Sequence, residues 1–193
     1  MYFRGSNKDI LQRFLDAANH FKTDIIVDVS GDKMYTDPHY IDKVVTSMNE
    51  SKIDFVIGSN SPEYFETDDH FIHGIIPAGI RKTALEKICQ LKKTEDTETG
   101  YREFFTKYDF INSKFIIPDQ KINYSKKIRL TLDYPEDYEL AKELFQKLKK
   151  NFSLEDIVEV FNEHPQLKNR TESLNEKWED EYERKITDFS LKK

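Results

Sequence analysis

Two aspartates stand out because each follows an apolar, strand-like run. Asp32 ends the run of residues 24–32, and Asp133 ends the run of residues 128–133. In an open α/β sheet, groups at the carboxyl ends of the strands face the crevice where ligands bind. Two carboxylates meeting there would form an oxygen-only site of the kind that Mg²⁺ prefers, and Mg²⁺ held in this way usually serves substrate phosphates. The pair therefore predicts phosphate or nucleotide chemistry.

Each aspartate also has a structural interpretation, which stays open. Asp32 follows Gly31, so it can simply cap a turn. Asp133 stands two residues before Pro135, a good helix start in which the aspartate would be the cap. For either residue alone the structural interpretation is favoured. Ligand binding gains support because both residues lie at strand ends of a fold whose strands share one ligand-binding edge.

Two further segments are candidates for ligand contacts. Arg4-Gly5-Ser6 lies at the start of a helical pattern, where a helix N-terminus binds anions and Arg4 can add a phosphate or base contact; the alternative is an ordinary cap in which Ser6 and Asp9 have capping-box spacing. Thr97-Glu98 precedes an aromatic helical segment. This pair either caps that helix or contributes to an acceptor pocket, and the capping interpretation is slightly favoured.

The composition excludes several classes of protein. The net charge of −6 and the pI near 5.5 argue against a nucleic-acid partner. No apolar stretch is long enough to span a bilayer and no signal-peptide pattern opens the chain, so we expect a cytoplasmic protein without a membrane partner. The five histidines share no metal-ligand spacing. The one cysteine, Cys89, cannot form an internal disulfide and is interpreted as a small buried residue.

Strand-like and helix-like segments alternate along the chain, which predicts an α/β fold with a mostly parallel sheet flanked by helices. Between residues 71 and 132 the strands are closer together, so some antiparallel pairing is expected there. The expected strands are residues 24–29, 53–57, 71–76, 115–117 and 128–132, and a turn is expected at residues 77–79. The expected helices are residues 10–21, 38–48, 82–91, 100–108, 135–149 and 153–164.

The end of the chain, residues 170–193, is highly charged. It is either a solvated helix that docks through Trp178, Tyr182 and Ile186, or a frayed tail. We therefore divide the chain into an α/β domain of residues 1–167 and a charged helical tail of residues 168–193.

Several motifs together resemble one enzyme family. They are residues 3–14, which contain Arg4-Gly5-Ser6, residues 25–27 with Gly31-Asp32 and Asp37-Pro38, residues 130–140 around Asp133, and residues 152–157 with His164-Pro165. Across residues 2–167 the chain resembles the sugar cytidylyltransferases. The acylneuraminate and 3-deoxy-manno-octulosonate enzymes are similar to it, as is the spore-coat-polysaccharide group.

The resemblance implies a nucleotide-diphospho-sugar transferase-like fold and a reaction. These enzymes join CTP to an acidic sugar of the nonulosonate or octulosonate type and release pyrophosphate. By resemblance Asp32 and Asp133 are the Mg²⁺ ligands, and Arg4, Gly5, Ser6 and Gly31 lie beside the nucleotide. Thr97 and Glu98 are assigned to the sugar substrate, and no residue is assigned as catalytic. Metal charge would offset the triphosphate and the leaving pyrophosphate.

Two departures from the family pattern matter. Family members begin with a strand and a glycine- and basic-rich loop that grips the triphosphate, whereas this sequence opens with Tyr2-Phe3-Arg4. After Gly-Asp the family usually has Cys or another small residue and then Pro, whereas Lys33-Met34-Tyr35 follow here. We therefore expect an incomplete Rossmann-like core and a chain that is inactive alone.

Two alternatives stay open. One is a non-catalytic domain that binds a sugar, a nucleotide or a partner subunit. The other is a different nucleotidyltransferase or glycosyltransferase with the same core. In the incomplete fold residues 24–29 would lack a neighbouring strand, and an uncovered apolar strand invites pairing with another chain. We therefore expect either a homo-oligomer or a marginally stable monomer.

Overall fold

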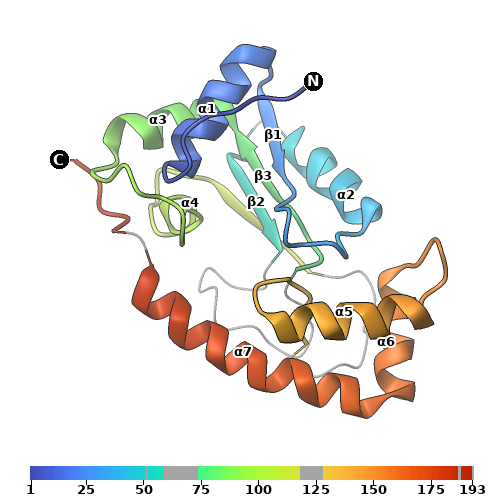
Figure 1. The fold of residues 1–193 in the computed structure, drawn as a ribbon. Helices are drawn as coiled ribbons and strands as arrows, with labels where there is room; N and C mark the ends of the chain where they lie inside the picture. The colour runs from blue at the N-terminus through green and yellow to red at the C-terminus, as the bar shows by residue number, and fades with distance from the viewer. Residues whose placement is uncertain (51, 59–73, 118–127, 187, 193) are drawn as a thin grey trace.

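The fold is a sheet of four strands with helices on both faces (Figure 1). It was obtained as a computed structural model that describes residues 1–50, 52–58, 74–117, 128–186 and 188–192. The strands are β1 (Ile25–Asp28), β2 (Phe55–Gly58), β3 (Ala78–Arg81) and β4 (Ser113–Ile116), and they lie in the order β1-β3-β2-β4.

Strand β3 runs against its neighbours. It pairs antiparallel with both β1 and β2, whereas β2 and β4 pair in parallel. Three of the four strands, β1, β2 and β4, therefore point in the same direction. The predicted α/β fold with a mostly parallel sheet is confirmed, as is the expected antiparallel pairing between residues 71 and 132.

Seven helices are present in the part of the chain that the structure describes. Local capping explains where several begin. Asp9 caps α1 by accepting a hydrogen bond from the backbone N–H of Gln12 at 3.1 Å, and Asp37 caps α2 with Pro38 in its first turn. Ser153 and Asp156 form a capping box at the start of α6. The helices are α1 (Ile10–Phe21), α2 (Pro38–Met48), α3 (Lys82–Leu91), α4 (Glu103–Thr106), α5 (Pro135–Lys147), α6 (Leu154–Glu163) and α7 (Pro165–Lys185).

The sheet separates two hydrophobic cores. Successive residues of β2 alternate between them: Phe55 and Ile57 belong to the core under α1 and α3, and Val56 belongs to the core under α2. This alternation follows from the two-residue repeat of a strand. Helices α5, α6 and α7 pack together at one end of the sheet and extend the second core (Figure 1). The site described below lies at this end.

Several predicted strands and turns are wrong in detail. Strand β1 is an edge strand rather than a central parallel one, and three of its four residues are only half-buried. Residues 128–132 belong to none of the four strands, although Arg129 is in a single β-bridge, and the buried side chain of Arg129 ties this segment to Asp133 and Asp137. Residues 77–79 are not a turn, because Ala78 begins β3. Of the strand expected at 71–76, residues 71–73 lie outside the described residues, and 74–76 are not a strand.

Two glycines explain other differences. A Cβ at Gly79 would lie 2.6 Å from Cγ1 of Val44, so the glycine lets α2 pack closely on β3. Gly100 has a φ of 84°, which a helix does not allow, and the helix expected over residues 100–108 is limited to α4.

The C-terminal region is a helix held at both ends. Helix α7 begins at Pro165, packs against α5 and α6, and its Arg170 forms an ion pair with Glu143 at 2.6 Å. Beyond α7 the chain returns to α3: the backbone N–H of Lys192 donates to the carbonyl of Leu91 at 2.6 Å. Of the two predicted forms of this segment, the docked helix is therefore confirmed and the frayed tail is not. The domain division at residue 167, which falls inside α7, stays a prediction.

Among the described helices there is none with the length and apolar character that crossing a membrane requires.

Candidate functional site

A cavity of about 240 Å³ opens at the end of the sheet where the chain leaves β1. Four separate segments build its wall: the loop after β1, the loop before α4, the segment before α5, and helix α7. Its lining residues are Ser30, Asp32, Lys33, Glu98, Thr99, Gly100, Tyr101, Arg102, Thr131, Asp133, Trp178 and Tyr182. The cavity therefore combines acidic, basic and aromatic side chains from distant parts of the sequence.

The two aspartates singled out by the sequence both line this cavity. Their segments are joined by a hydrogen bond of 3.0 Å from the backbone N–H of Leu132 to the carbonyl of Asp32. Burial raises the pKa of the Asp133 carboxyl, and the negative charge of Asp32 raises it further, whereas Arg129 opposes the rise. The two carboxylates are thus close enough to repel each other, and a cation between them would relieve the repulsion.

Asp133 is held in position by a buried arginine. The guanidinium of Arg129, which is 1% exposed, pairs with Oδ2 of Asp133 and donates to both carboxylate oxygens of Asp137 at 2.9 Å. Thr131 also donates to Oδ2 of Asp133, at 3.0 Å. Asp137 in turn accepts from the backbone N–H of Asp133 at 2.9 Å. Oδ1 of Asp133 makes no hydrogen bond to any described residue, so one oxygen stays available for a ligand.

Asp133 does not cap helix α5, which was the structural interpretation of this residue. The N-cap of α5 is Tyr134, and the carboxylate that accepts from its backbone N–H belongs to Asp137. Asp133 instead directs its side chain to Arg129 and Thr131 at the cavity wall.

Lys33 is a cavity residue that the sequence analysis noted only as a departure from the family pattern. The residue is 6% exposed and lines the cavity. Burial lowers the pKa of Lys33 to about 7 and Arg102 lowers it further, although Asp28, Asp32 and Asp133 act in the opposite direction. Burial of a lysine beside a second cation therefore disfavours its charged form.

The aromatic wall of the cavity comes from two directions. The hydroxyl of Tyr101 donates to Asp28 at the end of β1, and burial raises the pKa of Tyr101 above its ordinary value. Trp178 and Tyr182 project from α7 with their ring centroids 5.2 Å apart. A Cβ at Gly100 would lie 3.1 Å from the Tyr182 hydroxyl, so this glycine lets the loop approach α7 closely. Helix α7 is therefore part of the site.

Comparison with known proteins places the chain in a family, although no family model matches it. It is 30% identical over 180 residues to the uncharacterised protein MJ1063 of Methanocaldococcus jannaschii, an alignment that covers 91% of this chain and 68% of that protein. Its structure is also similar to the solved structure of a cytidylyltransferase from Leptospira borgpetersenii, with a TM-score of 0.70, 30% identity, and coverage of 86% of this chain and 67% of the other. The chain belongs to a cytidylyltransferase-like family.

A further relative of this cytidylyltransferase-like chain is the spore coat polysaccharide biosynthesis protein SpsF of Bacillus subtilis. The two are 25% identical over 170 residues, which covers 84% of this chain and 65% of SpsF. The chain thus spans about two thirds of the length of each of these three relatives. The solved relative has the nucleotide-diphospho-sugar transferase fold that the sequence predicted.

The predicted nucleotide-binding residues do not line the cavity of this cytidylyltransferase-like chain. Ser6 accepts a hydrogen bond through Oγ from the backbone N–H of Asp9 at 2.9 Å, and its carbonyl accepts from Arg13 at 3.0 Å. Neither Arg4 nor Gly5 is among the cavity residues. Gly31 is exposed and has open space beside it, so no close contact among the described residues requires a glycine there. Their roles beside a nucleotide stay predictions.

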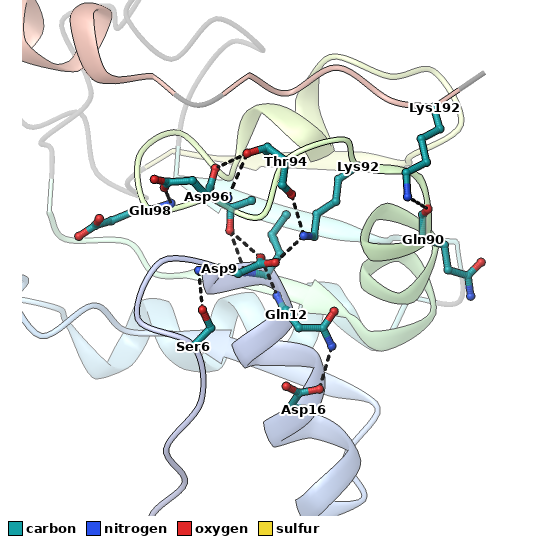
Figure 2. Close-up of polar contacts among 12 residues, drawn as sticks. Ser6, Asp9, Gln12, Asp16, Gln90, Lys92, Thr94, Asp96, Glu98 and Lys192 are labelled. Atoms are coloured by element: carbon teal, nitrogen blue, oxygen red, sulfur yellow. Dashed lines mark hydrogen bonds and ion pairs between the residues drawn. The ribbon is translucent and has the colours of Figure 1, made fainter.

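Thr97 and Glu98 have different places. Thr97 is fully buried; its hydroxyl donates to Oδ1 of Asp9 at 3.1 Å and accepts from the backbone N–H of Leu11 at 3.1 Å. Figure 2 shows Asp9 in its ion pair of 2.5 Å with Lys92. Thr97 thus anchors the loop to α1 and does not cap the aromatic helical segment that follows it, since the N-cap of α4 is Arg102. Glu98 lines the cavity.

The carboxylates fit a magnesium ion that a substrate completes. The described residues contain no group of three or more His, Cys, Asp or Glu side chains arranged to hold a metal. Mg²⁺ is commonly held by one or two carboxylates together with substrate phosphates and waters, so a full cage of protein ligands is not needed. Asp32 and Asp133 supply this donor set. Cys89 is not a competing reactive group, because burial raises the pKa of its thiol to about 12.

Proposed function

We propose that the cavity is the site of cytidylyl transfer, and that it binds CTP and a sugar. The observation that carries the proposal is the meeting of Asp32 and Asp133 in one cavity of a cytidylyltransferase-like chain. Arg129 supports the proposal because its buried guanidinium pairs with Asp133 and with Asp137, which holds Asp133 in position. Preorganised charge of this kind makes the main contribution to catalysis of phosphoryl and nucleotidyl transfer.

In the proposed reaction a hydroxyl oxygen of the sugar attacks the α-phosphorus of CTP. The new bond joins this oxygen to the α-phosphorus, and the bond from the α-phosphorus to the oxygen bridging to the β-phosphorus breaks. Pyrophosphate leaves with the electron pair, and the hydroxyl proton is released. Asp32 and Asp133 would hold Mg²⁺, which when bound offsets the charge on the leaving pyrophosphate. The rings of Trp178 and Tyr182 would exclude water from one side of the substrate.

The acceptor that we propose is an acidic sugar of the nonulosonate or octulosonate type. Support comes from the resemblance of residues 130–140 to the late aspartate motif of the enzymes that activate such sugars. The presence of Arg102 in the cavity also supports it, since guanidinium groups bind carboxylates well. SpsF is named for polysaccharide biosynthesis, which is a process that consumes activated sugars.

We further propose that these 193 residues do not turn over CTP without another segment or subunit. The six glycines are dispersed, with no two of them closer than five residues, so the sequence contains no glycine-rich loop to cradle a triphosphate. The same observation supports the second candidate function, a domain that binds a sugar or nucleotide without catalysis. Both candidates use the same cavity.

Calorimetric titration with CTP, in the presence and absence of Mg²⁺, tests the proposal. We expect Mg²⁺-dependent binding by the wild-type chain, and a loss of about tenfold or more in affinity in Asp32→Asn and in Asp133→Asn, because each removes a charged ligand. Asp24→Asn is the matched control, since Asp24 is exposed and does not line the cavity. Binding that is the same in all three variants would refute the proposed site.

An assay of pyrophosphate release tests the expected inactivity of the isolated chain. With CTP, Mg²⁺ and a nonulosonate, we expect no release by the isolated chain. Turnover that Asp32→Asn abolishes would contradict the expected inactivity while supporting cytidylyl transfer at this site. Turnover that Asp32→Asn leaves unchanged would contradict both.

A further inference from the structure

Lys33 is a buried lysine that no described residue neutralises directly. Only 6% of the residue is exposed, yet its ammonium makes no hydrogen bond and no ion pair within the part of the chain that the structure describes. The enclosed side-chain atoms without a partner in the described residues are the Tyr35 hydroxyl and Arg129 Nε, so the Lys33 ammonium keeps contact with solvent through the cavity. A largely buried cation without a protein partner is costly, and proteins seldom keep one for the fold alone. The side chain lines the cavity, which is where a partner can enter.

Other buried charges of this chain are treated differently. Lys92, also 6% exposed, pairs with Asp9 at 2.5 Å and donates to the carbonyl of Thr94 at 2.8 Å. Arg129 pairs with Asp133 and Asp137. The fold therefore supplies partners for these cations and none for Lys33 in the described ranges.

The acidic groups near Lys33 are already occupied or too far away. Asp28, Asp32 and Asp133 all favour the charged form of Lys33, but among the described residues none of them forms an ion pair with it. Asp28 accepts the hydrogen bond of Tyr101, and Oδ2 of Asp133 is taken by Arg129 and Thr131. The second cation of the cavity, Arg102, adds to the positive potential felt at Lys33. The cavity thus contains both carboxylate oxygens and positive charge.

We propose that the Lys33 ammonium, together with Arg102, binds an anionic oxygen group of the substrate. This inference rests on the proposed function, because it assigns a binding role within the same cavity. The group is either a phosphate of the nucleotide or the carboxylate of an acidic sugar, since both present anionic oxygens to a cation. A lysine suits this role as a compact point charge, and a cavity wall of low dielectric strengthens the attraction.

The one tryptophan of the chain, Trp178, lines the same cavity and reports on binding there. We would follow its fluorescence while titrating three probes without metal: inorganic pyrophosphate, N-acetylneuraminate, and the methyl ester of N-acetylneuraminate, which lacks the carboxylate charge. We expect the wild-type chain to bind at least one of the two anions, and to bind the acid at least tenfold more tightly than the ester if the group is the carboxylate.

Lys33→Met should weaken the affinity for that anion by about tenfold to hundredfold, which is the range for losing a charged hydrogen bond. Lys149→Met is the control, because Lys149 is an exposed lysine whose ion pair with Asp156 is remote from the cavity lining. A loss of affinity for pyrophosphate identifies the phosphate as the bound group, and a loss of affinity for N-acetylneuraminate identifies the carboxylate. Unchanged affinity for both anions, or no binding of either by the wild-type chain, would overturn the inference.

A second variant guards against misfolding. Lys33→Gln keeps a polar side chain and removes the charge, and it should show the same loss of affinity with an unaltered unfolding temperature or a higher one. The proposed function can be refuted independently of this inference. In that case Asp32→Asn leaves Mg²⁺-dependent CTP binding intact, while Lys33→Met still lowers the affinity for the anion. The opposite pattern overturns the inference about Lys33 and leaves the proposed function standing.

Discussion

Two lysines of this chain are buried to the same extent and yet are surrounded in opposite ways. Lys92 lies between α1 and α3, where Asp9 and the carbonyl of Thr94 satisfy its ammonium (Figure 2). Lys33 lies at the cavity, where none of the described residues forms an ion pair with it. One region is complete in the free chain, and the other is arranged as if a ligand were to complete it. Burial alone therefore does not reveal the role of a charged side chain, whereas its hydrogen-bond and ion-pair partners do.

The two regions are also connected. Thr97 belongs to the network of Lys92 and Asp9, and Glu98, the next residue, lines the cavity. The loop from Glu98 to Arg102 therefore starts from a fixed point on α1 and ends in the site. We interpret the Lys92 network as the rigid base on which one wall of the cavity is built.

The largest effect should come from breaking the Lys92 ion pair. Lys92→Met leaves the buried carboxylate of Asp9 without its cation, and we expect a loss of about 3–5 kcal/mol in the free energy of unfolding. Denaturant titration measures this loss. Lys8→Met is the control: the ion pair of Lys8 with Asp96 is 4.0 Å long and exposed, so we expect a change below about 1 kcal/mol. Equal effects of the two substitutions would show that the Lys92 pair is not a buried anchor.

A smaller loss in the free energy of unfolding is expected when the hydroxyl of Thr97 is removed. Thr97→Val keeps the shape of the side chain but leaves the backbone N–H of Leu11 without an acceptor, at a cost of about 1–3 kcal/mol. Thr94→Val is a suitable comparison, because the Thr94 hydroxyl makes only exposed hydrogen bonds. If Thr97→Val were as stable as the wild-type chain, the loop before the cavity would not depend on this anchor.

The smallest change should have the opposite sign. Lys33→Met removes an unpaired buried cation and keeps an apolar stem of similar length, so we expect the free energy of unfolding to rise by roughly 1 kcal/mol. The same denaturant titration detects this gain. A loss approaching that of Lys92→Met would mean that Lys33 holds the fold together, contrary to its surroundings in the structure.

The sequence predicted the features that depend on local patterns. Alternating strand and helix segments were sufficient for the α/β fold, and the helices expected at residues 38–48 and 153–164 match α2 and α6 to within one residue at each end. Asp32 and Asp133 line one cavity as expected, but not as strand ends: β1 ends at Asp28, and the segment before Asp133 belongs to none of the four strands.

The features that were missed depend on tertiary contacts. Residues 128–132 resemble a strand because Ile128 and Leu130 are apolar, but here residues 128–131 are buried around the ion pairs of Arg129. Strand β1 resembles a central strand because helices lie over both faces of the sheet, although its pairing places it at an edge. The binding role proposed for Lys33 has no sequence signature, since a lysine is ordinarily exposed. Homo-oligomerisation stays a prediction.

The most direct test of the account compares ligand-induced stabilisation in two variants. Thermal unfolding would be measured for the wild-type chain, Lys33→Met and Lys92→Met, each with and without Mg²⁺, CTP and N-acetylneuraminate. A ligand that binds the folded state raises the unfolding temperature. We predict that Lys92→Met unfolds at a lower temperature but keeps the ligand-induced rise, whereas Lys33→Met unfolds no lower than the wild-type chain and loses much of the rise. Retention of the full rise in Lys33→Met, with its loss in Lys92→Met, would contradict the assignment of one lysine to the ligand and the other to the fold.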